Sequence, residues 1–165
     1  TLRGQTLVAR EPRECLTRSN KLLYESTSPE KFATLFYGIL DNQRHSLAFS
    51  NAGHDHPFLI STDGTFKRLA TGGMMLGAFD TFSFEDETTP VQPGDTLVLY
   101  SDGIPEAMDA SGEQYGEERL MKFLIEHRDK SPGELLDALV RDVEHYAGDH
   151  PQSDDMTIVV IKRPR

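Results

Sequence analysis

The sequence has a single cysteine, no long apolar run and no stripe of basic residues, and each absence excludes a class of protein. With Cys15 alone the chain cannot form an intramolecular disulfide, and a reducing, cytoplasmic location is expected. No apolar run approaches the ~18 residues of a membrane span, and the first residues contain no signal-peptide core. A net charge of −10 without a basic stripe argues against a nucleic-acid surface.

The remaining composition is that of a soluble globular protein. The 165 residues are 37% hydrophobic and 27% charged, and we expect residues 1–165 to form a single domain. We interpret Cys15 as a small core residue, because no triad signature surrounds it. An acidic chain attracts cations and repels phosphate-rich polymers, so a site that handles phosphate here would need a local cation.

The order of residue patterns predicts one helix, a series of short strands, two more helices and a last strand. Pro12 suits the first turn of a helix over residues 11–25. Strands joined as hairpins are predicted over residues 32–40 with 45–51, and over residues 58–60 with 66–69. Residues 71–73 with Gly77 make a glycine-rich loop, which could line a substrate channel but which we interpret as a flexible connector. Residues 82–87 alternate weakly, as an edge strand does.

The second half of the chain is more regular. Residues 96–100 form a fully apolar stretch suited to a sheet interior, and residues 156–161 form a β-branched strand. Helices are predicted over residues 116–127 and from a capping box at Ser131 to a stop at Gly148. Because hairpin turns join several strands, the expected fold class is α+β, with two packed antiparallel sheets flanked by helices.

Carboxylates at two strand ends are the candidates for chemistry. Asp102 follows the strand over residues 96–100, and Asp154 and Asp155 precede the final strand. Strand ends are rigid, so a site there would be well held. Carboxylates suit Mg²⁺ or Mn²⁺, and two such ions can share a water and position a phosphoryl group. From spacing alone, an ordinary turn and a solvated strand cap are the commoner explanation.

The sequence around these carboxylates narrows the interpretation. Residues 100–107 with 116–120 resemble the Asp-Gly signature of the RsbU and stage II sporulation protein E group, which are bacterial PPM, or type 2C, serine/threonine phosphatases. Residues 153–157 resemble the closing Asp-Asp-hydrophobic-Thr signature of this group, and residues 32–41 and 50–54 resemble its two middle motifs. Four motifs in the right order cover essentially the whole chain, which is a highly specific combination.

The resemblance implies a PPM phosphatase-like sandwich with a centre for two Mn²⁺ or Mg²⁺ ions at one end. By motif, Asp102 and Asp154 would be the metal ligands and the catalytic residues. Five further residues would lie behind the ligands or on the substrate side: Gly103, Asp155, Asn51, His54 and Glu106. The implied reaction is hydrolysis of phosphoserine or phosphothreonine by direct attack of metal-activated water on phosphorus, without a phospho-enzyme.

Two departures from the family pattern matter. The family opens with strands and a Gly-Asp-Val-Ser-Gly-like motif whose Asp bridges both metals, and nothing before Phe32 matches it. We therefore expect the chain to be the C-terminal portion of the domain, without its first strands and helix and without activity on its own. Gly53-His54 stands where many type 2C enzymes have Gly-Asp, so the optional third-metal carboxylate is absent, with Asp55 as a weak substitute.

Two local alternatives stay open. In a strand, His54 and His56 would point to one face and could form a zinc pair, although no third ligand is evident. The family pattern instead makes residues 51–54 a turn, which we prefer. Glu106 could form hydrogen bonds near the metals or cap the turn after Asp102.

Three functions are consistent with these observations. The first is a phosphatase in the parent protein, and the resemblance implies a STAS-domain anti-sigma-factor antagonist as substrate and an upstream sensor or receiver domain. The second is a pseudophosphatase that binds a signalling partner without catalysis. The third is a self-associating fragment such as a homodimer, because missing opening strands would leave sheet edges unpaired.

Overall fold

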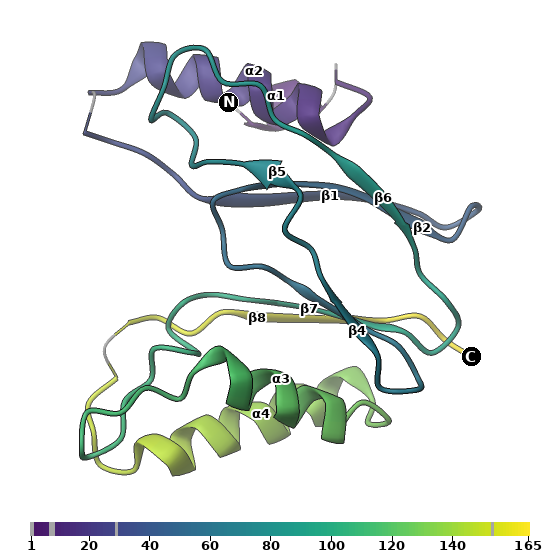
Figure 1. Cartoon of the computed structure of the whole chain (residues 1–165), viewed down its shortest axis with the longest axis vertical. Coiled ribbons are helices and arrows are strands. Elements are labelled where there is room, and N and C mark those ends of the chain that lie inside the picture. The colour runs from purple at the N-terminus through teal and green to yellow at the C-terminus, as the bar shows by residue number, and fades with distance from the viewer. Residues whose placement is uncertain (1, 7–8, 29, 153) are drawn as a thin grey trace. The chain divides into compact units, whose positions relative to one another are not determined.

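The computed structural model describes residues 2–6, 9–28, 30–152 and 154–165. These residues group into two compact units, each with a four-stranded sheet (Figure 1). One unit comprises Thr1–His56 and Leu69–Val91, and the other comprises Pro57–Arg68 and Gln92–Arg165. Both carboxylate segments singled out in the sequence therefore belong to the second unit.

The first unit combines two helices with a sheet centred on one strand. Its elements are α1 (Leu2–Thr6), α2 (Pro12–Ser26), β1 (Leu35–Asp41), β2 (Ser46–Ala52), β5 (Gly72–Gly73) and β6 (Glu87–Pro90). Strand β2 pairs antiparallel with β1 and β6 and parallel with β5. The predicted first helix and first hairpin are both confirmed.

Helix α2 is held by its buried face. Pro12 stands at its first turn, and Leu16 packs with Ala52 of β2 in a buried cluster. Cys15 is also fully buried, and this burial raises the pKa of its thiol. Cys15 is therefore a small core residue, as the sequence predicts.

Two predictions in the first unit are wrong. The glycines at 72 and 73 form strand β5 rather than a flexible connector, because the Asn51 N–H donates to the Thr71 carbonyl at 2.9 Å and aligns the two backbones. The expected edge strand at residues 82–87 lies further along, as β6. Phe82 and Phe84 instead pack edge to face at 5.1 Å, and Phe84 is buried.

The second unit has an antiparallel sheet with two helices. Its elements are β3 (Phe58–Ile60), β4 (Phe66–Arg68), β7 (Thr96–Tyr100), α3 (Glu117–Glu126), α4 (Pro132–Ala147) and β8 (Ile158–Lys162). The strands are ordered β4-β3-β7-β8, and each neighbouring pair is antiparallel. The predicted second hairpin, both helices and the final strand are confirmed, and the final strand begins two residues later than expected.

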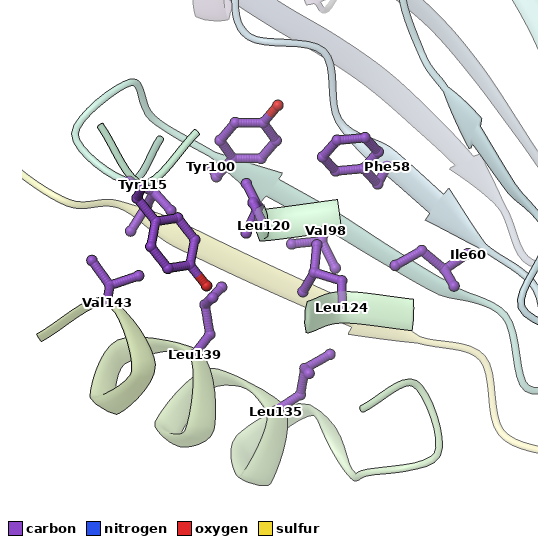
Figure 2. Packing of buried hydrophobic residues seen from close by; sticks show 11 residues of the cluster. Phe58, Ile60, Val98, Tyr100, Tyr115, Leu120, Leu124, Leu135, Leu139 and Val143 are labelled. Carbon is purple, nitrogen blue, oxygen red and sulfur yellow. The ribbon is translucent and has the colours of Figure 1, made fainter. Parts of the chain in front are cut away.

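The core of the second unit explains why these helices form. Leu135, Leu139 and Val143 recur at helical spacing on α4 and point toward β7, where Val98 and Tyr100 are buried (Figure 2). Burial of each large side chain contributes about 1.5–3 kcal/mol. The Ser131 capping box is present with both of its hydrogen bonds, and Gly148 ends α4 with a positive φ of 56°.

The α+β class with two sheets and flanking helices is confirmed, with β2 and β5 as a short parallel exception. Within the described ranges, no helix combines the length and the apolar character needed to cross a membrane.

Candidate active site

The ladder between β7 and β8 brings the two carboxylate segments to one place. Tyr100, the last residue of β7, pairs with Ile158, the first residue of β8. One more bond extends the ladder, because the Ser101 N–H donates to the Thr157 carbonyl at 3.0 Å. The residues that follow β7 and those that precede β8 therefore lie side by side at the same end of the sheet.

The Ser101 side chain connects these two segments. Its Oγ donates to the Asp155 carbonyl at 3.0 Å and accepts from the Thr157 N–H at 2.9 Å. The sequence alone did not point to Ser101, because serine is common at strand ends. Its partner Asp155 lies 54 residues later in the chain, so the contact depends on how β8 pairs with β7. Ser101 is a positioning residue for the carboxylates on both sides.

Gly103 allows the closest approach between the two segments. A Cβ at this position would lie 3.2 Å from the Asp154 carbonyl oxygen and 2.5 Å from that of Asp155, and the second distance is shorter than real Cβ contacts. The glycine of the Asp-Gly signature therefore has a packing reason. It lets the backbone after Asp102 lie against the backbone of the closing motif.

The two candidate ligands are exposed and only lightly engaged. Oδ1 of Asp102 accepts from the Gly103 N–H at 3.0 Å, and Oδ1 of Asp154 accepts from the Asp155 N–H at 2.7 Å. Among the residues that the structure describes, neither carboxylate forms an ion pair with Lys or Arg. Each therefore keeps oxygen lone pairs for a ligand.

The loop after Asp102 is anchored on both helices. The Tyr115 N–H donates to the Ala107 carbonyl at 2.7 Å, and the Tyr115 hydroxyl donates to Oδ2 of Asp142 on α4 at 2.6 Å. Burial, together with this carboxylate, raises the pKa of Tyr115 well above its usual value. The Arg119 guanidinium of α3 lies 5.5 Å from the ring centre of Tyr115. These contacts hold the loop against the helices.

Glu106 does not cap the turn after Asp102 with its side chain. The turn is closed by the backbone, through the Glu106 N–H and the Asp102 carbonyl at 2.9 Å. The Glu106 carboxylate is exposed and has no hydrogen bond within the described part of the chain. A role near the metals stays a prediction for this residue, as it does for Asp155, which is also exposed.

Asn51 and His54 form a turn in the first unit, as the family pattern predicts. The Asn51 amide donates to the His54 carbonyl at 2.9 Å and accepts from the His54 N–H at 2.8 Å. Gly53 between them has a positive φ of 69°. The strand required to align His54 with His56 as a zinc pair is absent, since residues 53–57 lie between β2 and β3. A contribution of Asn51 and His54 to the metal site stays a prediction.

The donor set fits a hard divalent cation. Among the described residues, no three side chains of His, Cys, Asp or Glu gather closely enough to form a metal cage. Mg²⁺, however, is usually held by one or two carboxylates together with waters and substrate phosphate oxygens. Asp102 and Asp154 offer such a pair on adjacent, well-held segments, whereas a zinc site would need more nitrogen or sulfur ligands.

Comparisons with known proteins agree with this geometry. The chain is 30% identical to protein IcfG of Synechocystis over 80% of the chain, and 27% identical to the phosphoserine phosphatase RsbU of Bacillus subtilis over 92% of the chain. It spans 21% of IcfG and 45% of RsbU, less than half of each relative.

Solved structures show the same fold. The PP2C domain of SiaA from Pseudomonas aeruginosa superposes with a TM-score of 0.82 at 24% identity, over 96% of this chain and 63% of that domain. The model of the family described as Stage II sporulation protein E (SpoIIE) matches residues 1–164. With nearly every residue inside that match, and with a PP2C phosphatase fold, the chain belongs to the stage II sporulation protein E family.

Proposed function

We propose that this chain is part of a metal-dependent phosphatase that hydrolyses phosphoserine or phosphothreonine on a regulatory protein. The observation that carries the proposal is the meeting of the Asp102 and Asp154 segments at one end of the β7–β8 ladder. The family supports the reaction class, since the relative RsbU is named a phosphoserine phosphatase. Exposed carboxylates with unused oxygens favour catalysis over the non-catalytic binding alternative.

Each residue at this end of the sheet has a defined task in the proposal. Asp102 and Asp154 hold Mn²⁺ or Mg²⁺, and a bound ion of this kind supplies charge that activates water and neutralises a phosphoryl group. Ser101 fixes the spacing of the two segments through its bonds to the Asp155 carbonyl and the Thr157 N–H. Gly103 keeps the space between the segments free of a side chain.

The family resemblance supports a finer assignment of substrate and control. We infer that the phosphoprotein is an anti-sigma-factor antagonist with a STAS domain, and that a sensor or receiver domain in the parent protein controls the site. The net charge of −10 fits a site in which the metal, rather than a basic side chain, attracts the phosphate.

Phosphate release by the full-length parent protein tests the proposal. With Mn²⁺ present, it should hydrolyse p-nitrophenyl phosphate and a phosphoserine peptide. Asp102→Asn and Asp154→Asn should each lower kcat/KM by about 100-fold or more, because each removes a charged metal ligand. Asp137→Asn is the matched control, since Asp137 is an exposed carboxylate on α4 with no place in the proposed site. Activity that survives both ligand substitutions, or that resists EDTA, would contradict the assignment.

A further inference from the structure

A pocket lies beside the two segments that carry Asp102 and Asp154. Its lining includes Gly103, the residue after Asp102, and Met156, two residues after Asp154. The end of α4 forms another wall, through Val143, Glu144 and Ala147. The pocket has a volume of about 140 Å³. At ~30 Å³ per water this is the space of roughly five waters, enough for one side chain.

The lining of the pocket combines apolar residues with one acidic residue. Val143 is almost fully buried, and Met108, Ala147 and Met156 add aliphatic surface. Glu144 lines the same pocket, and its carboxylate has no hydrogen bond or ion pair within the residues that the structure describes. An aliphatic stem with a cationic tip satisfies both features at once, because its methylenes cover the apolar wall and its charge meets the carboxylate.

The electrostatic surroundings favour the same ligand. The pocket lies at the C-terminal end of a 16-residue helix, where the helix dipole attracts positive charge. The two segments that build this end, residues 99–118 and 142–161, contain six and five acidic residues, against Arg119 and Arg141 directly beside them, and Arg119 stacks on Tyr146. Among the described lining residues, His150 alone has a side chain that can become cationic, and its Nδ1 lies 3.0 Å from the Pro151 carbonyl oxygen.

We propose that this pocket binds a lysine or arginine side chain that lies close in sequence to the phosphoserine of the protein substrate. This inference rests on the proposed function, which brings the phosphoserine to Asp102 and Asp154. Successive residues of a peptide are 3.8 Å apart, and the pocket begins one residue after Asp102 and two residues after Asp154. A residue a few positions from the phosphoserine therefore reaches it. The pocket would make the enzyme prefer phosphosites with a basic neighbour.

Phosphoserine peptides that differ at a single position test this preference in the full-length parent protein with Mn²⁺. Lysine, alanine, leucine or glutamate is placed at each of three positions on either side of the phosphoserine. At one position, lysine should raise kcat/KM about fivefold over alanine, and glutamate should lower it, as expected for a partly exposed charge pair at a helix end. Glu144→Gln should bring the lysine-to-alanine ratio close to one.

A second carboxylate on α4 provides the control for Glu144. Asp137→Asn, on the same helix and seven residues before Glu144, removes a carboxylate about 10 Å away and should keep the full ratio. Equal turnover of all peptides by the wild type, a preference for leucine, or a lysine preference that survives Glu144→Gln would each overturn the proposal.

Binding of the same peptides separates this inference from the proposed function. Fluorescence anisotropy of labelled lysine and alanine peptides reports on the pocket without catalysis. If no Mn²⁺-dependent turnover occurs, the proposed function fails, yet tighter binding of the lysine peptide that is lost in Glu144→Gln still supports the pocket. Normal turnover with equal binding of both peptides overturns the pocket alone.

Discussion

The two strand-end turns of this chain use their polar side chains in opposite ways. In the first unit Asn51 is buried, and both ends of its amide bond the backbone of His54. In the second unit Asp102 and Asp154 are exposed, and within the described ranges each side chain accepts only the N–H of the next residue. In the first turn the side-chain amide bonds the backbone of the turn itself, whereas in the second turn carboxylate oxygens stay available for a ligand.

Close backbone packing is common to both turns and so does not distinguish them. A Cβ on Gly72 would lie 2.0 Å from the Asn51 carbonyl oxygen, and a Cβ on Gly103 would lie 2.5 Å from that of Asp155. Both turns are thus held by a glycine that admits a second backbone. The difference lies in whether the polar side chains already have hydrogen-bond partners within the turn, and it is the reason we propose the second turn as the metal-binding one.

The largest expected effect on stability is at the closest backbone contact. Gly72→Ala places a methyl group 2.0 Å from a carbonyl oxygen and 2.3 Å from the Asn51 nitrogen, so β5 has to separate from β2. We expect the free energy of unfolding in urea to fall by about 3 kcal/mol. Gly133→Ala is the control, because no atom lies within 4 Å of its Cβ. A loss equal to that of the control would show that β5 does not constrain the turn.

A smaller effect is expected from the polar groups themselves. Asn51→Ala removes two hydrogen bonds in a buried site and should lower the free energy of unfolding by about 2 kcal/mol.

Ser101→Ala also removes two side-chain hydrogen bonds, but at a more exposed position, and should lower the free energy of unfolding by about 1 kcal/mol. Urea unfolding of both variants checks the order. The reverse order would contradict the contrast drawn between the two turns.

Local signals in the sequence were sufficient to predict α2, α3, α4 and most strands, but not α1. The Ser131 capping box, Gly148 and the spacing of Leu135 and Leu139 specify α4 without reference to other elements. Asp102 could be placed at a strand end because residues 97–100 form a continuous run of large hydrophobic residues. Its nearness to the closing motif depended on a family resemblance, and the pairing of Tyr100 with Ile158 supplies the physical cause.

Features that depend on pairing between distant segments could not be predicted. Strand β5 is two residues long and forms only because β2 lies beside it, and β6 ends at Pro90 where it pairs with Ser46. The bridge made by Ser101 and the bond between Tyr115 and Asp142 likewise join residues 54 and 27 positions apart. No local pattern encodes these contacts.

Mn²⁺ binding by the full-length parent protein, measured by titration calorimetry in a double-mutant cycle, tests whether Asp102 and Asp154 share a metal centre. If Asp102 and Asp154 hold one shared metal centre, Asp102→Asn and Asp154→Asn should each weaken binding by about tenfold or more. The double variant should then lose clearly less than the product of the two single effects, because the second substitution acts on a centre already disrupted. Unchanged affinity in either single variant, or independent effects that multiply, would show that the two carboxylates do not share a metal centre.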